Sequence, residues 1–533
     1  MQGRLIRWAV TAALAGFLFG FDTVVISGAE KTIQELWSLR PAVHGLAMSM
    51  ALWGTVAGSL VGSIPTDLFG RRKTLLSIGI LYFVSAVWSG LATDATSFMI
   101  ARFIGGLGVG ISTVVAPLFI SEISPAQYRG RLAGMFQFNI VFGILIAFVS
   151  NSLIGGIGEN AWRWMLGVEA IPALIYSLMC FSLPESPRWL IGRKGDRATA
   201  AGVLQKIHPE MTGEQITAKV DEIANAATEA QKSPGSLGKR LRLPILLALL
   251  IAFFNQLSGI NAILYFAPRI FELTGLGAKA ALLQSVGIGV TNLIFTFVGL
   301  WLIDRLGRRT LLYIGSFGYI ASLGLCAWAF FTYAPQFNVA TRSIELSTAV
   351  GKMTAAEGAA GYTDKDRAAL RESYESARNA WLAATADEKY LGGPVTLPAG
   401  ATSEFVDQLA KSTLQTAAQY TGAGSKLVLF CIFAFIAAHA VGQGAVIWVF
   451  ISEIFPNRQR ALGQSLGSFT HWIFAALLTL CFPIAITSFP PGYVFGFFCF
   501  MMVLQLVWVK LMVPETKGRA LEQLEHGLVE TPT

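Results

Sequence analysis

The seven residues Asp67-Leu-Phe-Gly-Arg-Arg-Lys73 reveal the architecture of the chain, because they return later in it as Asp304-Arg-Leu-Gly-Arg-Arg-Thr310. Two further pieces recur in the same order: SEISPAQYR at 121–129 returns as SEIFPNRQR at 452–460, and PES at 184–186 returns as PET at 514–516. Counted from glutamate to proline, the later two pieces are 62 positions apart in the first copy and 61 in the second. This agreement in register predicts two homologous halves.

The composition is that of a membrane protein. Of the 533 residues, 54% are hydrophobic and only 14% are charged, whereas a soluble domain is about 25% charged. Disordered chains, collagen-like fibres, disulfide scaffolds and ordinary cytosolic enzymes are therefore excluded. The five cysteines lie inside apolar runs without metal-ligand spacing, so no metal site is expected.

Twelve apolar runs are long enough to cross a bilayer, which takes about 20 residues. The first run carries a charged residue, Asp22, and lacks a cleavage site, so it is interpreted as a retained span and not as a signal peptide. Two mirrored six-helix halves predict an all-α membrane protein with a substrate site between the halves near mid-membrane. The runs begin near residues 8, 43, 74, 96, 132 and 163, and near residues 243, 280, 310, 426, 462 and 491.

The basic residues indicate the orientation. The net charge of +8 is gathered in alternate loops, as the positive-inside rule requires and as a nucleic-acid surface does not. Both termini are therefore expected in the cytoplasm, and the address is expected to be the bacterial cytoplasmic (inner) membrane. The predicted division is 1–192 for the first bundle, 193–241 for a cytoplasmic linker with short helices, 242–333 for spans seven to nine, 334–425 for an extracytoplasmic insertion, 426–513 for spans ten to twelve, and 514–533 for a cytoplasmic tail.

The insertion explains the one mismatch between the halves. Asp67 and Glu122 are 55 positions apart, but Asp304 and Glu453 are 149 apart, so the second half holds about 94 more residues. Within the insertion, Thr363 with Asp366 resembles a capping box, and apolar residues then repeat at helical spacing. A second helix is expected from Glu404 into span ten, with Phe405, Leu409 and Tyr420 on its apolar side. The sequence leaves open whether the insertion is a solvated appendage or a lid over the outer mouth.

Taken together, these motifs resemble the sugar porter family of the major facilitator superfamily, whose members include bacterial proton-coupled monosaccharide symporters. The likeness rests on the two DxxGRR repeats, on Pro184-Glu-Ser-Pro-Arg-Trp-Leu190, on Gln256-Leu-Ser-Gly-Ile-Asn261 and on Pro514-Glu-Thr-Lys-Gly518. It covers the whole chain except the insertion. The resemblance implies transport by alternating access.

The charged motifs lie at helix ends on the predicted cytoplasmic side. They either signal topology alone or form ion pairs between the halves that latch the outward-facing state, and the resemblance favours the latch. Each such pair contributes only about 1 kcal/mol, so several must act together. The candidate gating charges are Asp67, Arg71, Arg72, Glu122, Arg129, Glu185, Arg188, Asp304, Arg308, Arg309, Glu453, Arg460 and Glu515.

A sugar site needs amides, which both donate and accept hydrogen bonds, and aromatic faces for the C–H surface. Span seven offers Gln256, Asn261 and Tyr265 at spacings that share roughly one helix face. Buried amides in a membrane bond either neighbouring helices or a ligand, and the resemblance implies the ligand. By the same likeness Phe19, Gln137, Asn292, Gly444, Trp448 and Trp472 match sugar-contacting positions.

Two residues depart from the family pattern. Asn255 stands where a second glutamine is usual, and His471 stands where an amide is usual. Imidazole still bonds a hydroxyl but also titrates near neutral pH. The identity of the sugar is therefore left open.

The proton site is expected at Asp22, because a carboxylate within a membrane span is costly and marks function. Arg102, which opens span four, is its natural partner. The pair is either a static ion pair or a proton carrier, and the resemblance implies the latter because proton-coupled members have an aspartate at this position.

The sequence thus predicts a monomeric secondary transporter that imports a hexose or pentose with protons. It is expected to need no cofactor beyond the proton gradient, to have no nucleic-acid partner and to be no enzyme. The alternatives are a sugar facilitator without proton coupling and a sugar sensor built on a transporter fold.

Overall fold

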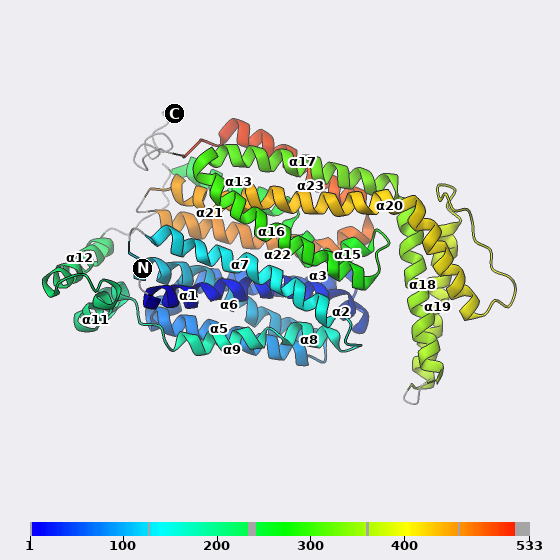
Figure 1. Ribbon diagram of the computed structural model, residues 1–533, viewed down its shortest axis with the longest axis horizontal. Coiled ribbons are helices and arrows are strands. Elements are labelled where there is room, and N and C mark those ends of the chain that lie inside the picture. Colours follow the sequence, from blue (N-terminus) through cyan, green and yellow to red (C-terminus); the bar gives the residue numbers. More distant parts are fainter. Residues whose placement is uncertain (1–2, 126–127, 233–240, 359–361, 457–458, 518–533) are drawn as a thin grey trace.

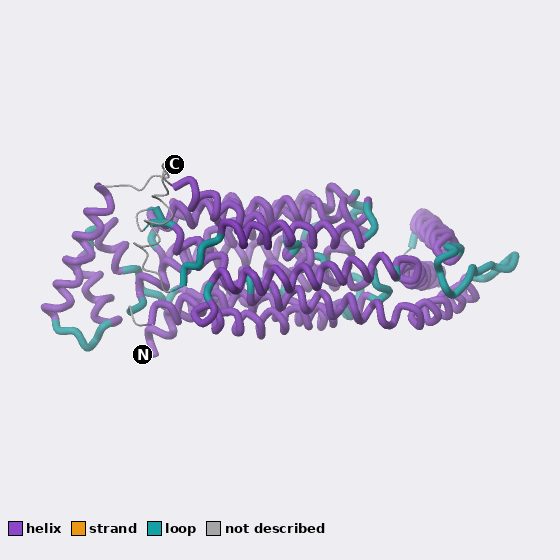
Figure 2. Tube along the Cα trace, turned by 90° about the horizontal axis from the view of Figure 1, so that it is seen from above, coloured by secondary structure: helices purple, strands orange, loops and turns teal. Residues whose placement is uncertain are grey.

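The structure is a computed structural model that describes residues 3–125, 128–232, 241–358, 362–456 and 459–517. Every regular element of this part of the chain is a helix (Figure 2). Ten helical segments are long and apolar enough to cross a membrane, and the bent pair α3 (Pro41–Val61) and α4 (Ser63–Phe69) makes an eleventh. The one predicted span that remains, the sixth along the chain, corresponds to α8 (Ala161–Gly167) and α9 (Ala170–Cys180), which are interrupted between Gly167 and Ala170.

The remaining spans of the first half are continuous helices. Their bounds are α1 (Gly3–Val25), α5 (Arg71–Leu91), α6 (Ala95–Ile123) and α7 (Arg129–Ile154). In the second half, spans seven and ten are broken. The bounds are α13 (Arg242–Leu257) with α14 (Ile260–Tyr265), α16 (Ala278–Leu306), α17 (Arg308–Thr332), α20 (Ser403–Val441) with α21 (Gln443–Ile454), α22 (Arg460–Ser488) and α23 (Pro491–Met512).

The two ends of the bundle differ. The end at which α1 begins and α23 ends also carries α11 (Arg197–Ile207) and α12 (Gly213–Lys232) and is called the linker end (Figure 1). The opposite end carries α18 (Ala334–Gly358) and α19 (Asp364–Thr385), which lie across the bundle axis, and is called the insertion end (Figure 1). An even number of spans returns the chain to the end where it began.

The two halves meet along two helix pairs. The helix α3 packs on α22, and α7 packs on α16. At the first contact Gly45 is required, because a Cβ there would lie 2.0 Å from the carbonyl oxygen of Leu480. Closely packed helices of this kind depend on small residues where the backbones approach.

The insertion is a small helical domain with its own core. The predicted capping box is confirmed, since Thr363 and Asp366 cap α19 reciprocally. Tyr374 and Trp381 are buried, and Trp381 donates a hydrogen bond to Ser343 at 3.0 Å. The helix α18 was not predicted, because its residues are too polar to read as a span.

The expected apolar side of α20 was wrong for Phe405 and Tyr420, whereas Leu409 is half-buried and packs against the core of the insertion. Phe405 and Tyr420 are 44% and 42% exposed, while the buried stripe follows Val406, Ala410 and Ala417. Small residues at this spacing let α20 lie close against α18, and the larger rings are left outside. The long helix α20 therefore joins the insertion rigidly to span ten.

Candidate functional site

The predicted proton pair is formed in the first half. Arg102 on α6 lies with Nη1 2.6 Å from Asp22 Oδ1 on α1, and its Nη2 donates to the backbone carbonyl of Asp22 at 3.0 Å. Both side chains are 2% exposed. Charges buried this deeply persist only when they are paired and hydrogen-bonded, so the helices hold a charge pair away from lipid.

Sequence reasoning missed a third member of this cluster, Glu169, at the break between α8 and α9. Glu169 is 1% exposed, and its Oε1 has no hydrogen-bond partner among the described residues. It interacts electrostatically with both Asp22 and Arg102. The signal that would have found it was present: it is a carboxylate within the sixth apolar run, and such residues mark function by default.

The numbers of acidic and basic groups in the cluster of Asp22, Glu169 and Arg102 favour the binding of a proton. Two carboxylates lie within electrostatic reach of one guanidinium, so the cluster carries a net negative charge unless one carboxyl group holds a proton. A low-dielectric interior disfavours unbalanced charge, and two carboxylates that share a site therefore tend to share a proton. The buried hydroxyl group of Tyr82 lies within electrostatic reach of the same groups.

The amides of span seven come together at its break. Gly259 adopts φ +88°, a conformation that glycine allows, and ends the turn after α13. Asn261 on α14 then donates to Gln256 Oε1 at 2.6 Å, and Gln256 Nε2 donates to Asn255 Oδ1 at 2.9 Å. Gln256 Nε2 also lies 3.1 Å from Nε2 of His471 on α22.

Four rings continue from this amide cluster toward the first half. Trp448 on α21 and His471 have ring centroids 5.1 Å apart, and His471 and Trp472 have centroids 4.7 Å apart. Trp472 meets Phe19 on α1 edge-on at 5.5 Å. The structure thus brings seven of the predicted sugar-site residues into one cluster that spans both halves: Phe19, Asn255, Gln256, Asn261, Trp448, His471 and Trp472.

The other four predicted residues do not take part in this cluster of hydrogen bonds and ring contacts. Tyr265 is 1% exposed and interacts electrostatically with Arg102, so it lies on the side of the proton cluster. Gln137 and Asn292 lie on α7 and α16, and their amides make no hydrogen bond within the described part of the chain. Gly444 begins α21 beside His439, whose ring nitrogen Nδ1 lies 2.8 Å from Tyr319 Oη.

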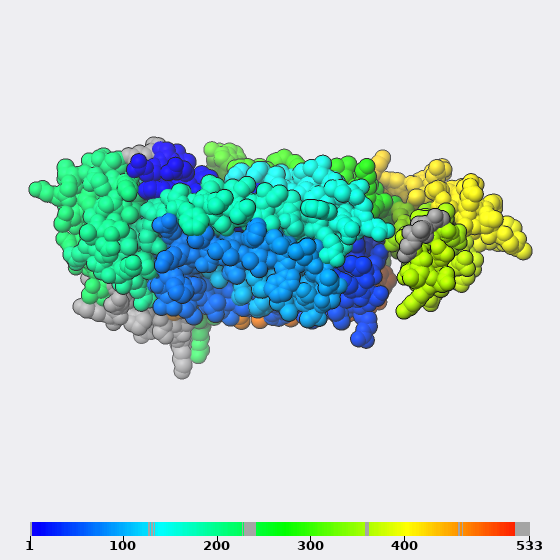
Figure 3. Space-filling model, turned by 90° about the horizontal axis from the view of Figure 1, so that it is seen from below, coloured from blue at the N-terminus to red at the C-terminus, as the bar shows by residue number. Residues whose placement is uncertain are grey.

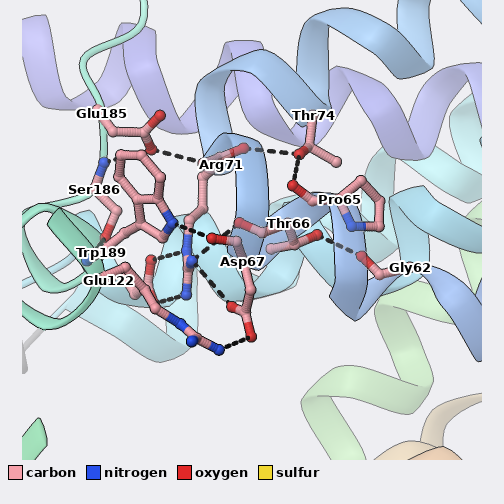
Figure 4. Close-up of polar contacts among 12 residues, drawn as sticks. Gly62, Pro65, Thr66, Asp67, Arg71, Thr74, Glu122, Glu185, Ser186 and Trp189 are labelled. Carbon is pink, nitrogen blue, oxygen red and sulfur yellow. Dashed lines mark hydrogen bonds and ion pairs between the residues drawn. The ribbon is translucent and has the colours of Figure 1, made fainter.

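The charged motifs form two matching clusters at the linker end. Arg71 binds Glu122 through two hydrogen bonds of 3.0 Å, and its backbone N–H donates to Glu185 at 2.8 Å (Figure 4). Arg308 repeats this arrangement with Glu453 at 2.7 and 3.1 Å and with Glu515 at 2.9 Å. The repeated motifs are therefore structurally equivalent.

These clusters lie within the halves. Among the described residues, no ion pair at the linker end joins one half to the other. Arg72 and Arg309 donate to the backbone carbonyls of Phe181 and Lys510, and Asp67 and Asp304 pair with the arginines four residues later. Arg188 interacts electrostatically with Glu222 of α12. Two side-chain nitrogens of Arg460 are buried without a partner in the described chain, and the side chain of Arg129 lies outside the described residues.

A latch between the halves is found at the insertion end instead, and the sequence did not predict it. Glu30 of α2 (Glu30–Leu36) lies 2.8 Å from Arg269 of α15 (Ala267–Glu272), which also donates to Gln34 at 2.6 Å. Lys31 and Glu272 form a second pair at 2.5 Å. Glu30 is 1% exposed, and His44 Nε2 on α3 lies 3.2 Å from its Oε2. We refer to Glu30, Lys31, Arg269 and Glu272 as the latch.

Glu30, the more deeply buried of the two latch carboxylates, is charged at neutral pH. Burial acts to raise the pKa of Glu30, but the charge of Arg269 and the hydrogen bond with His44 outweigh burial and hold this pKa below its ordinary value. The stabilisation that Glu30 contributes to the closed end is therefore complete above the ordinary pKa of a glutamate. It is lost as the pH falls through the lowered pKa.

Glu30→Gln is expected to open the insertion end. Removal of one partner of a buried ion pair costs on the order of 3 kcal/mol, so a Ser27→Cys reporter should be labelled by an impermeant maleimide at least about tenfold faster. The native cysteines are replaced beforehand. The matched variant is Lys31→Gln, because Lys31 is 47% exposed and exposed pairs contribute at most about 1 kcal/mol. A labelling rate in Glu30→Gln that is no higher than that of the reporter protein with Glu30 intact would contradict the latch.

Helices in two repeated halves, with polar clusters buried inside the bundle, define a membrane transporter of the major facilitator fold. The family model described as "Sugar (and other) transporter" matches residues 8–358 and 406–528, so the chain belongs to the sugar porter family. The match omits residues 359–405, which hold α19 and the loop after it.

Curated relatives and solved structures agree with this assignment. The chain is 28% identical to the arabinose-proton symporter of Bacillus subtilis over 98% of this chain and 95% of the relative. It is 28% identical to the D-xylose-proton symporter of Escherichia coli over 97% and 94% of the two chains. The xylose transporter XylE of E. coli in a partially occluded inward-open conformation matches with a TM-score of 0.70, 26% identity and coverage of 97% and 100%. The same transporter bound to 6-bromo-6-deoxy-D-glucose matches with a TM-score of 0.65, 28% identity and coverage of 98% and 99%.

Proposed function

We propose that this sugar transporter is a monosaccharide–proton symporter that works by alternating access. The observation that carries the proposal is the buried cluster of Asp22, Glu169 and Arg102, in which Arg102 pairs with Asp22 and a second carboxylate, Glu169, lies within electrostatic reach of both. A facilitator has no use for so costly a group in mid-span. The names of the arabinose-proton and D-xylose-proton symporters support the same coupling.

In this proposal the sugar binds at the amide and ring cluster. The amides of Gln256 and Asn261 exchange their mutual hydrogen bonds for bonds to sugar hydroxyls, and Trp448 and Trp472 supply apolar faces. Tyr265 lies on the same short helix as Asn261 and interacts electrostatically with Arg102. Sugar binding therefore reaches the proton cluster through α14.

Transport also needs two gates. The structure is latched at the insertion end, while the linker end has no ion pair between the halves in the described chain. This supports assignment of the structure to an inward-open state with the linker end in the cytoplasm, since basic residues favour that side. The gating charges of the linker end would then pair across the halves in the opposite state.

The proposal is tested with purified protein in proteoliposomes. Labelled pentoses, hexoses and inositols are offered with and without an inward proton gradient. At least one monosaccharide is expected to accumulate above its external concentration, and a protonophore should abolish the accumulation. Equal initial and final uptake with and without the gradient would indicate a facilitator, and binding without any turnover would indicate a sensor.

A further inference from the structure

A cavity of about 690 Å³ lies at the insertion end, next to the latch. Three parts of the chain form its wall: the first half through α2 and α8, the second half through α15 and α16, and the insertion through α18. Figure 3 shows the insertion as a lobe beyond the end of the bundle. The volume lies in the range of small-molecule sites, about 300–1,000 Å³.

The cavity wall is polar but nearly balanced in charge. It carries five carboxylates and four cationic side chains. Three of the cations already face a carboxylate: Arg269 faces Glu30, Lys31 faces Glu272, and Lys352 faces Glu35. The fourth, Arg163, donates to the carbonyls of Gly90 and Ala92. A charged ligand would meet groups of its own sign on every side, whereas a neutral polyhydroxylated ligand finds donors and acceptors alternating.

Ser27 supplies to the cavity wall a buried hydroxyl group that has no hydrogen-bond partner in the described chain. Ser27 is 2% exposed, and its hydroxyl group makes no hydrogen bond among the described residues. A buried hydroxyl without a partner is costly, and a ligand hydroxyl in the cavity would satisfy it. Ser27 follows α1 directly, so this contact is continuous with the helix that carries Asp22.

The insertion forms part of the cavity wall, because residues of α18 line it. Thr341 on α18 donates to the backbone carbonyl of Glu272 at 3.2 Å, and Lys352 lies 3.6 Å from Glu35 across the halves. The same helix is fixed from behind by the buried Trp381 of α19. Without the insertion, the cavity would lose the part of its wall that α18 forms.

We propose that this cavity is a second, outer binding site for the transported monosaccharide, which rests on the proposed function. The outer sugar contacts Glu30 and Arg269 from the side opposite the bundle core. Its hydroxyl groups compete for the hydrogen bonds of the latch, so that arrival of sugar weakens the contact that keeps this end closed. Sugar occupies the outer site before it reaches the amide cluster, and it moves from the outer site to the amide cluster when the latch opens.

The test separates the two sites with a variant that lacks the inner one. Saturation-transfer NMR, which detects weak binding, is recorded with D-xylose, D-glucose and myo-inositol on the wild type and on Gln256→Ala. The Gln256→Ala variant is expected to keep a residual saturation-transfer signal, which comes from sugar bound at the outer site. Thr348→Trp, on the exposed cavity face of α18, should then remove the residual signal, because the indole fills the cavity.

The matched variant is Thr354→Trp, an exposed α18 position outside the cavity wall, which should leave the residual signal unchanged. In vesicles with the insertion end outward, Thr348→Trp alone should raise the uptake KM at least about fivefold and leave the efflux KM unchanged. A wild-type signal that vanishes entirely in Gln256→Ala, or a residual signal that survives Thr348→Trp, overturns the outer site and leaves the symport proposal standing. A wild type that binds none of the probes overturns both.

Discussion

Asp22→Asn is expected to abolish proton-driven sugar accumulation while sugar exchange persists. The substitution keeps the shape of the side chain and removes its proton equilibrium. Glu169 and Arg102 then remain as a balanced pair, so the buried cluster stays neutral and the fold is retained. Without a carboxylate at position 22 the cluster has no need of a proton, and the coupled proton flux should fall to background.

Two assays on the same proteoliposomes check this result. Accumulation under an inward proton gradient should be lost, whereas counterflow between equal sugar concentrations should stay within about twofold of the wild type. Glu169→Gln is expected to lose accumulation as well, because it balances the cluster in the same way. The matched control is Asp364→Asn, a chemically identical change on the exposed face of α19. Undiminished accumulation in Asp22→Asn would remove the basis for proton coupling.

The second large effect is expected from Gln256→Ala. Gln256 connects Asn255, Asn261 and His471 through its single amide group, so its truncation leaves three polar groups misplaced at once. If each lost hydrogen bond costs about 1 kcal/mol, sugar affinity should fall by about a hundredfold. Trp448→Ala should also weaken binding severely, because it removes the ring that packs at a tilt against His471.

The Kd of both variants is measured by isothermal titration calorimetry with the sugar that the uptake assay has identified. The matched control is Gln505→Ala, because Gln505 is a fully buried amide of α23 that bonds Ser316 away from the ring cluster. This control should lower thermal stability and leave the Kd unchanged. A Kd unaffected in both Gln256→Ala and Trp448→Ala would show that sugar does not bind at the amide and ring cluster.

The site illustrates where sequence patterns stop. The proximity of Gln256 to Asn261 follows from a spacing of five residues, and Asp22 with Arg102 follows from the cost of a lone charge in a membrane. Glu169 is subject to the same physical rule, but it stands 147 positions from Asp22, and its place in the cluster depends on how α9 packs against α1 and α5. The latch was missed for the same reason, since α2 and α15 belong to different halves.

Four features follow from the amino-acid sequence alone: the helical membrane fold, the two repeated halves, the capping of α19 and the residue types of both clusters. These follow from apolar run length, from motifs repeated in register and from local hydrogen bonding, all of which act over a few turns of helix. Only the tertiary structure decided which end of the bundle is latched, which face of α20 is buried, that Glu169 joins Asp22, and that α18 walls a cavity. Those features depend on helix rotation and on the side-chain volumes that meet across interfaces, and residues distant in sequence set these jointly.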